Sequence, residues 1–204
     1  MQNRDHWEGV YTSKETNAVS WYQEHADQSL RLIRDTGAGA QASIIDVGGG
    51  ASTLVDDLLG EGYQNLTVLD VSGAALAAAQ RRLGSLAERV QWIQADITKV
   101  SLPAAGFDIW HDRAVFHFLT QPDDRAAYVK TLSAAVKPGG HVIIATFAED
   151  GPERCSGLPV LRYSPDALQN ELGSAFSLVR HEKEAHHTPF GTVQQFLYCY
   201  FRAD

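Results

Sequence analysis

The chain has 204 residues and a formal net charge of −8, with 44% hydrophobic and 21% charged residues. These values predict a soluble globular protein that can bury most of its apolar surface. Because Lys and Arg are outnumbered and form no cluster, the charge argues against partners such as nucleic acid or an anionic membrane. Two distant cysteines, Cys155 and Cys199, and the lack of a signal peptide or long apolar segment favour a cytoplasmic protein.

The first forty residues predict a helical segment ahead of the main domain. Apolar residues recur at helical spacing from Tyr22 to Ile33, which predicts an amphipathic helix over residues 20–34. Four aromatic residues crowd this otherwise polar leader, namely Trp7, Tyr11, Trp21 and Tyr22. We therefore expect residues 1–40 to form a lid and residues 41–204 to form the main domain.

After residue 41, short apolar runs typical of buried strands alternate with helical patterns. The predicted strands lie at residues 44–47, 66–69, 90–93, 107–110 and 142–147, and the predicted helices at 54–59, 74–83 and 125–136. Such alternation predicts a parallel sheet with helices on both faces. Ser72 is a candidate helix cap, and Lys137-Pro138-Gly139-Gly140 predicts a helix end followed by a turn.

The C-terminal part predicts a different connection. Ser164-Pro165-Asp166 is typical of a capped helix start, and this helix should end near Leu172. Two β-rich runs, 176–182 and 193–201, follow without a helix between them, so they should pair antiparallel. The predicted fold is an α/β, Rossmann-like, seven-stranded sheet that is mostly parallel and has a C-terminal antiparallel hairpin.

Candidate ligand-binding residues follow three consecutive strands. Open α/β sheets bind ligands beyond the carboxyl ends of their strands. The first strand is followed by glycines that allow a ligand close to the backbone, the second ends in an acid suited to two ribose hydroxyls, and the third leads to a carboxylate and an apolar side chain suited to adenine. These residues are Asp46, Gly48, Gly49 and Gly50, then Asp70, then Asp96 and Ile97.

Two cofactor classes fit this pattern, nicotinamide dinucleotides and S-adenosylmethionine. The dinucleotide motif requires a third glycine where Thr53 stands, and the chain lacks a second mononucleotide-binding half. The ordered motifs resemble those of class I S-adenosylmethionine-dependent methyltransferases over residues 42–148. They are Asp46-Val47-Gly48-Gly49-Gly50, Leu69-Asp70-Val71-Ser72, Ala95-Asp96-Ile97, Phe107-Asp108 and Leu132…Val136-Lys137-Pro138-Gly139-Gly140.

The resemblance implies a role for each matching residue, and S-adenosylhomocysteine as the product. Asp46 and Gly48 to Gly50 would hold the amino-acid part of the cofactor, Asp70 the ribose, and Val71, Asp96 and Ile97 the adenine. His111 and Trp21 would also contact the cofactor. The family usually has a further glycine where Ser52 stands, so the methionine end would be held somewhat differently here.

The segment after the fourth strand, Trp110 to Leu119, supplies the candidate residues for chemistry. We expect Asp112, Arg113 and His117 to be catalytic, and Tyr11, Tyr22 and Phe116 to bind the acceptor. We expect no metal, because His181, His186, His187 and Cys199 match no standard ligand spacing.

The absence of an obvious general base or substrate-recognition insert favours a small-molecule acceptor, such as a thiol or another soft nucleophile. Two alternatives stay open. The leader resembles that of a branch that includes eukaryotic elongation-factor and citrate-synthase lysine methyltransferases, so a protein lysine is possible. That branch tends to carry an Asp-Lys-Gly-Thr-type sequence where this chain has Asp112-Arg113-Ala114-Val115. The other alternative is a cofactor-binding interaction module without catalysis. The sequence does not predict the oligomeric state.

Overall fold

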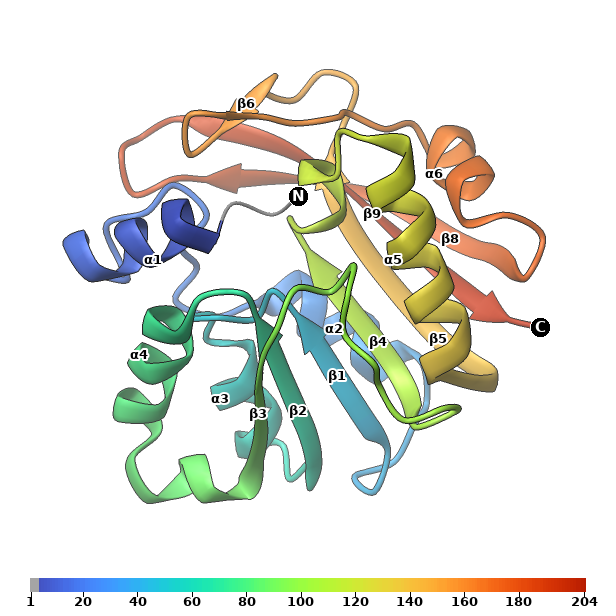
Figure 1. Cartoon of the computed structure of the whole chain (residues 1–204), viewed down its shortest axis with the longest axis horizontal. Helices are drawn as coiled ribbons and strands as arrows, with labels where there is room; N and C mark the ends of the chain where they lie inside the picture. Colours follow the sequence, from blue (N-terminus) through green and yellow to red (C-terminus); the bar gives the residue numbers. More distant parts are fainter. Residues whose placement is uncertain (1–3) are drawn as a thin grey trace.

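A computed structural model describes residues 4–204 and contains a central seven-stranded sheet (Figure 1). Its strands lie in the order β3-β2-β1-β4-β5-β9-β8. Their bounds are β1 Ser43–Val47, β2 Asn65–Asp70, β3 Val90–Gln94, β4 Phe107–Arg113, β5 Val136–Phe147, β8 Phe176–His187 and β9 Val193–Ala203. The first five are parallel, whereas β9 is antiparallel to both β5 and β8. The predicted sheet and its closing hairpin are confirmed.

Helices cover both faces of this sheet. One face packs against α2 (Asp27–Asp35), α3 (Leu54–Gly60) and α4 (Gly73–Leu83), and the other against α5 (Pro122–Ala135) and α6 (Pro165–Leu172). A further helix, α1 (Arg4–Ser13), lies beside α4 (Figure 1). No helix among the described residues is long and apolar enough to cross a membrane.

Short elements connect the larger ones. The 3₁₀ helices η1 (Gly84–Arg89) and η2 (Phe116–Phe118) follow α4 and β4, and a small hairpin of β6 (Arg154–Cys155) and β7 (Leu158–Pro159) follows β5. The two predicted helix caps are present. Ser72 Oγ accepts a hydrogen bond from the Ala75 amide and Ser164 Oγ one from the Ala167 amide.

The segment Lys137-Pro138-Gly139-Gly140 differs from the predicted turn because it lies within β5. The pairing with β4 passes from Phe107↔Val136 to Ile109↔His141, so these residues form a bulge in the strand. Gly139 supplies the positive φ of 68° that this bulge requires.

The helix predicted to begin at residue 20 starts at Asp27 instead, so that prediction was wrong for residues 20–26. The carbonyl oxygens of this stretch accept hydrogen bonds from distant side chains: Ser20 from His186, Trp21 from Arg113 and Gln23 from Thr53. A helix would use those carbonyls internally, so tertiary contacts outweigh the local helical pattern here. The sequence also did not predict α1. Residues 1–3 of the expected lid lie outside the described residues.

Candidate active site

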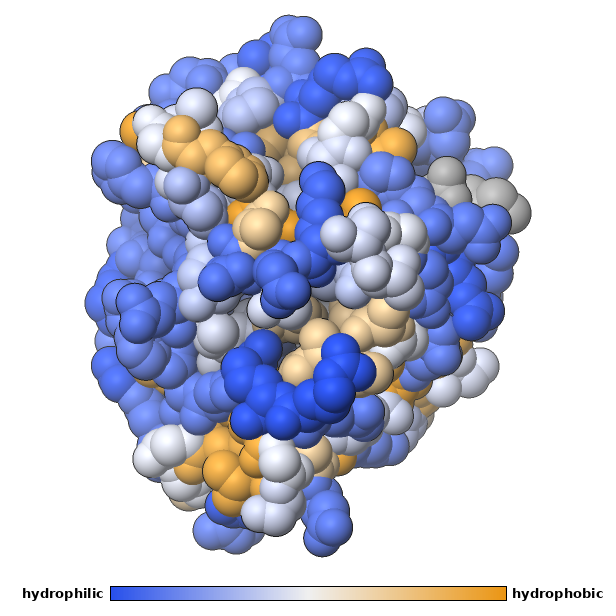
Figure 2. Space-filling model, turned by 90° about the vertical axis from the view of Figure 1, so that its left-hand side faces the viewer, coloured by the Kyte–Doolittle hydropathy of each residue, from blue (hydrophilic) through white to orange (hydrophobic). Residues whose placement is uncertain are grey.

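Two adjoining cavities, of about 590 Å³ and 580 Å³, lie at the carboxyl ends of the parallel strands. Figure 2 faces the side that carries α1 and shows hydrophobic atoms in a hollow within a mostly hydrophilic surface. We call the first the adenosine cavity; it is lined by Trp7, Tyr11, Trp21, Val47, Gly48, Leu69, Asp70, Val71, Ile97, Arg113, Ala114, Val115, Phe118 and Cys155. The second, the methionine cavity, includes Tyr22, Ser29, Gly48, Gly49, Ser52 and His111 in its lining.

The turn after β1 has no room for side chains. Gly48 has a φ of 71°, and a Cβ added there would overlap the side chain of Val115. A Cβ on Gly49 would overlap the carboxylate of Asp46, and one on Gly50 would lie 2.6 Å from Asp70 Oδ2. Only backbone therefore faces the cavities at this turn, as close approach of a ligand requires.

Asp70, at the end of β2, is 7% exposed and lines the adenosine cavity. One of its oxygens accepts a hydrogen bond from the Ser72 amide at 2.8 Å. Burial raises the pKa of Asp70 to about 7, and the nearby charges of Asp46 and Glu8 act in the same direction. Hydroxyl donors of a ribose would compensate for this burial, and Val71 and Ile97 provide an apolar surface for adenine beside it.

This elevated pKa predicts that cofactor binding weakens as the pH falls. The ribose hydroxyls are expected to donate to the ionised carboxylate, so Asp70 should lose its proton on binding whenever the pH is below about 7. Affinity should be level well above the pKa of Asp70 and fall by up to roughly tenfold per pH unit below it. Calorimetric titrations from about pH 6 to about pH 8.5 measure this, and Asp70→Asn, which cannot titrate, should lose the dependence. A wild-type affinity that stays level with pH would contradict it.

The leader helix α1 is attached to α4 by one acidic side chain. The carboxylate of Glu8 accepts hydrogen bonds from Ser72 Oγ at 3.0 Å and from the amides of Gly73 and Ala74 at 2.9 Å each. The two amides belong to the first turn of α4, where amides lack partners within the helix and a negative charge is favoured. The pKa of Glu8 is lowered chiefly by the bond from Ala74. Sequence reasoning missed Glu8, because no local pattern connects it to a helix start 64 residues away.

Aromatic side chains from the leader form a wall of the adenosine cavity. Trp7 and Tyr11 are four residues apart on α1 and so share one face of the helix. The ring of Trp7 meets those of Trp21 and Phe118 edge to face, with centroids 5.6 and 5.1 Å apart. Trp21 Nε1 donates to the hydroxyl of Tyr11 at 3.0 Å. Four aromatic rings thus form one connected wall.

A chain of buried polar groups runs along one wall of the methionine cavity, which Ser29, His111 and Arg113 line. Asp46 Oδ1 lies 2.7 Å from His111 Nδ1, and His111 Nε2 lies 2.8 Å from Ser29 Oγ. The Ser29 hydroxyl lies 3.3 Å from that of Tyr198, which accepts a hydrogen bond from Arg113 Nε at 3.0 Å. Asp46 therefore orients His111 and lies behind the cavity wall. Ser29 and Tyr198 were not predicted from the sequence.

Arg113 lies where the two cavities meet and lines both. Its Nη1 donates to the Trp21 carbonyl at 3.2 Å, and its guanidinium carbon lies 4.2 Å from the centre of the Phe196 ring. Glu184 is 3.6 Å from Nη2. Contacts with three separate segments fix this cation in place.

Asp112, expected to be catalytic, does not line either cavity. Neighbouring residues of a strand point to opposite faces, so its side chain points away from the side that His111 and Arg113 occupy. Its fully buried carboxylate accepts hydrogen bonds from the Val115 amide at 2.9 Å and the Tyr128 hydroxyl at 2.6 Å. Burial raises the pKa of Asp112 to about 6. Its structural role is to hold the turn between β4 and η2.

Two more residues of this segment lie behind the cavity walls. His117 is fully buried, and its Nδ1 accepts a hydrogen bond from the Phe147 amide at 3.2 Å. Burial lowers the pKa of His117 to about 3, which keeps the ring neutral. Phe116, expected to bind the acceptor, packs in the core against Tyr128 and Tyr163.

Of the three residues expected at the adenine, Val71 and Ile97 line the cavity, whereas Asp96 accepts hydrogen bonds from the amide and hydroxyl of Thr98. Tyr22 lies in the methionine cavity.

Within residues 4–204, no three His, Cys, Asp or Glu side chains converge as a metal site. Cys155 lines the adenosine cavity, and burial raises the pKa of its thiol to about 12.

Comparison with known proteins agrees with this geometry. A family model described as a methyltransferase domain matches residues 44–140. EEF1A lysine methyltransferase 2 of Danio rerio is 29% identical over 160 residues, which are 72% of this chain and 69% of that protein.

Solved structures share the fold over nearly the whole chain. A structure solved for the conversion of a disulfide bond into a thioacetal group during echinomycin biosynthesis superposes with a TM-score of 0.77 at 18% identity, covering 98% of this chain and 92% of that one. The N-methyltransferase NodS of Bradyrhizobium japonicum WM9, bound to S-adenosylhomocysteine, gives a TM-score of 0.70 at 18% identity and covers 96% and 97%.

The strand order matches the class I methyltransferase fold, and the glycine turn and Asp70 lie at the cavities beyond its strand ends. The methyltransferase-domain match and the shared fold support a class I S-adenosylmethionine-dependent methyltransferase, with S-adenosylmethionine as the cofactor. When bound, this cofactor supplies a methyl group carried on a positively charged sulfur.

Proposed function

We propose that this enzyme methylates a small acceptor that enters the site as an anion, and that the acceptor atom is a thiolate sulfur. One observation carries the proposal: among the described residues, the adenosine cavity is lined by the guanidinium of Arg113 and, apart from Asp70, by no side chain that would accept a proton at neutral pH. An acceptor that is already ionised needs no such side chain.

The acceptor's direction of approach follows from the lining. In this proposal the adenosine is surrounded by residues at or just after the ends of β2 and β3, namely Leu69, Asp70, Val71 and Ile97. The remaining wall consists of the leader aromatics, the turn after β4 and Cys155. Methyl transfer is an in-line displacement, so the nucleophile must approach from this second wall, which is largely apolar and excludes water.

The ionisable groups of this cavity are Asp70, Arg113, Tyr11 and Cys155. In this proposal Asp70 binds the ribose. Burial raises the pKa values of the Tyr11 hydroxyl and the Cys155 thiol, so both keep their protons at neutral pH and cannot act as bases. Arg113 stays protonated and favours an anion beside it. A thiol, with an ordinary pKa of about 8.5, reaches this site as an anion far more readily than an alcohol does. An ammonium group must lose a proton to become a neutral amine.

Of the residues expected to be catalytic, the proposal keeps Arg113 in contact with the acceptor. Asp112 acts through the turn that carries Val115, and His117 acts through its bond with the Phe147 amide, so both are positioning residues. Tyr22 faces the methionine end of the site.

A second candidate is N-methylation of a protein lysine, which the similarity to EEF1A lysine methyltransferase 2 favours. A lysine ammonium must first lose a proton, and here it would approach the guanidinium of Arg113. The lining therefore favours the thiolate over the lysine.

The test is a panel of acceptors incubated with S-adenosylmethionine, with S-adenosylhomocysteine formation as the readout. The panel contains small aromatic and aliphatic thiols, matched amines and alcohols, and lysine-containing protein from a lysate. Thiols should react, and their kcat/KM should rise with pH up to the pKa of each thiol, because no enzyme base contributes. Asp70→Ala, deprived of its ribose contact, is the background control.

Methylation of lysine or of amines without reaction of the thiols would overturn the proposed acceptor. A pH profile that stays the same for thiols of different pKa would show that the enzyme supplies a base, and would overturn the argument from the lining.

A further inference from the structure

Four of the residues that the structure describes line both cavities: Tyr11, Trp21, Gly48 and Arg113. The adenosine and methionine arms of the cofactor meet at its sulfur atom. Since each arm occupies one cavity, the sulfur must lie at the junction that these four residues surround. Two of the four are aromatic, and both come from the leader rather than from the sheet.

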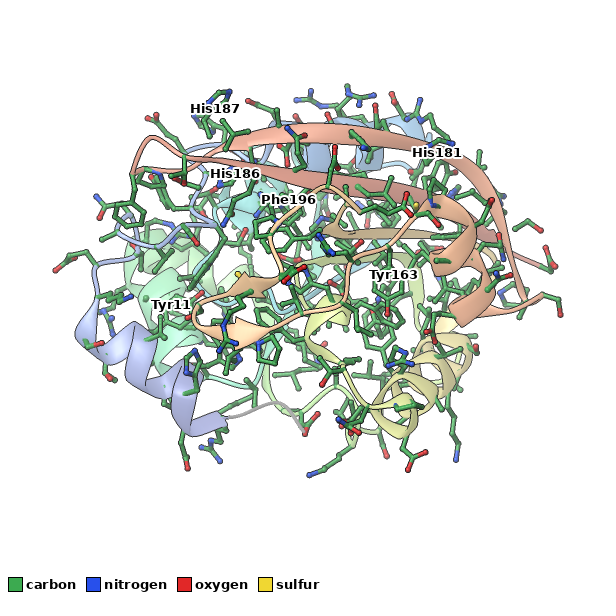
Figure 3. The ribbon with its side chains drawn as sticks, turned by 90° about the horizontal axis from the view of Figure 1, so that it is seen from above. Tyr11, Tyr163, His181, His186, His187 and Phe196 are labelled. Carbon is green, nitrogen blue, oxygen red and sulfur yellow. The ribbon has the colours of Figure 1, made fainter. Side chains whose placement is uncertain are left out.

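The positions of these two rings are fixed. Tyr11 follows Glu8 by one helical turn, and Glu8 holds α1 against the start of α4. The rings of Tyr11 and Trp21 have centroids 6.3 Å apart at 73°, and the indole nitrogen donates to the phenol oxygen. Figure 3 shows Tyr11 on the α1 side of the molecule, with Phe196 on β9. The leader therefore presents preformed aromatic rings at the junction.

We infer that Tyr11 and Trp21 form a binding site for the sulfonium cation and distinguish the charged methyl donor from its uncharged product. Aromatic faces attract cations, and partly desolvated examples are stronger than exposed ones. The inference rests on the cofactor and is independent of the acceptor's identity.

The charge of Arg113 opposes the binding of a sulfonium at the junction, and the aromatic rings offset part of that repulsion. The Arg113 guanidinium lies over Phe196, and Glu184 lies 3.6 Å away, so its field is partly neutralised on the side away from the cavities. Asp70 adds negative charge on the adenosine side. The aromatic rings are then the groups at the junction whose interaction depends most directly on the charge of the sulfur.

This site favours exchange of the product for a new donor molecule. The acceptor's electron pair forms the new bond to the methyl carbon while the carbon–sulfur bond breaks, and that bonding pair stays on the sulfur. The sulfur thereby becomes a neutral thioether, and its attraction to the two rings is lost. Aromatic recognition of the sulfonium thus tightens binding of the donor while leaving the product free to dissociate.

The experiment compares two ligands that differ only in the methyl group and its charge. S-adenosylmethionine and S-adenosylhomocysteine are titrated separately by calorimetry into wild type, Tyr11→Leu, Trp21→Leu and Tyr11→Phe. The leucine variants should weaken S-adenosylmethionine binding roughly 3- to 30-fold while changing S-adenosylhomocysteine binding by about twofold or less. Tyr11→Phe keeps the ring and should keep the wild-type ratio of the two affinities.

Trp92→Leu is the matched control, because Trp92 lies on β3, bonds to the Ala87 carbonyl and lines neither cavity. Equal weakening of both ligands in the leucine variants would show that the rings only close the cavity, and would overturn the inference. If wild type bound neither ligand, the cofactor assignment itself would fail, which is a different result.

Discussion

Asp70→Ala is expected to weaken S-adenosylmethionine binding by about 1–3 kcal/mol, which is roughly 5- to 150-fold in Kd. Asp70 is the acid that faces the adenosine cavity, and its loss leaves the ribose hydroxyls without a charged acceptor. Calorimetric titration at about pH 8, where Asp70 is mostly ionised given its pKa of about 7, measures the full effect.

The matched control is Asp108→Ala. Asp108 lies near the start of β4, at the amino-terminal ends of the parallel strands and away from the cavities. There it binds Lys137 Nζ and the Ser43 amide at 2.8 Å each. This variant should bind the cofactor as wild type does, although it loses an ion pair. A similar loss of affinity in both variants would mean that the ribose position has been misassigned.

Gly48→Ala is expected to have the second large effect, on both folding and binding. The added methyl group would overlap Val115, and alanine at a φ of 71° is strained. Overpacking costs about 1–3 kcal/mol and the left-handed conformation about 1–2 kcal/mol, so unfolding free energy should fall by about 2–5 kcal/mol. Urea denaturation measures this loss, and cofactor titration should show that the turn no longer admits the ligand.

Gly62→Ala separates the two causes. Gly62 has a φ of 87°, similar to that of Gly48, but an added Cβ meets no atom within 4 Å. This variant should lose only the conformational part, about 1–2 kcal/mol, and bind the cofactor normally. Equal destabilisation of the two variants would show that contact with Val115 contributes nothing.

Most of the sheet could be predicted because its signals are local. Buried parallel strands appear as apolar runs, and the residues that follow them are adjacent in the chain, so the positions of Gly48 and Asp70 follow directly from the strand ends. The capped starts at Ser72 and Ser164 are likewise encoded within four residues.

The rest of the site depends on contacts between distant residues. Glu8 and Ser72 are 64 positions apart, and Ser29 and Tyr198 are 169 positions apart, so no spacing rule connects them. One signal was present and not used: the strand through His111, Asp112 and Arg113 alternates, so the middle residue had to face away from the other two.

The position of β9 has a consequence for how the protein acquires its activity during synthesis. This strand follows all the others in the chain, yet it lies between β5 and β8 and carries the Tyr198 and Phe196 side chains that hold Arg113. The chain emerges from the ribosome from its N-terminal end at about 5–20 residues per second, far more slowly than helices and hairpins form. The glycine turn and Asp70 can thus be in place while β5 still has an open edge. The contacts of Arg113 with Tyr198 and Phe196 form only after β9 has emerged. A prematurely terminated chain would therefore leave the edge of β5 exposed to aggregation.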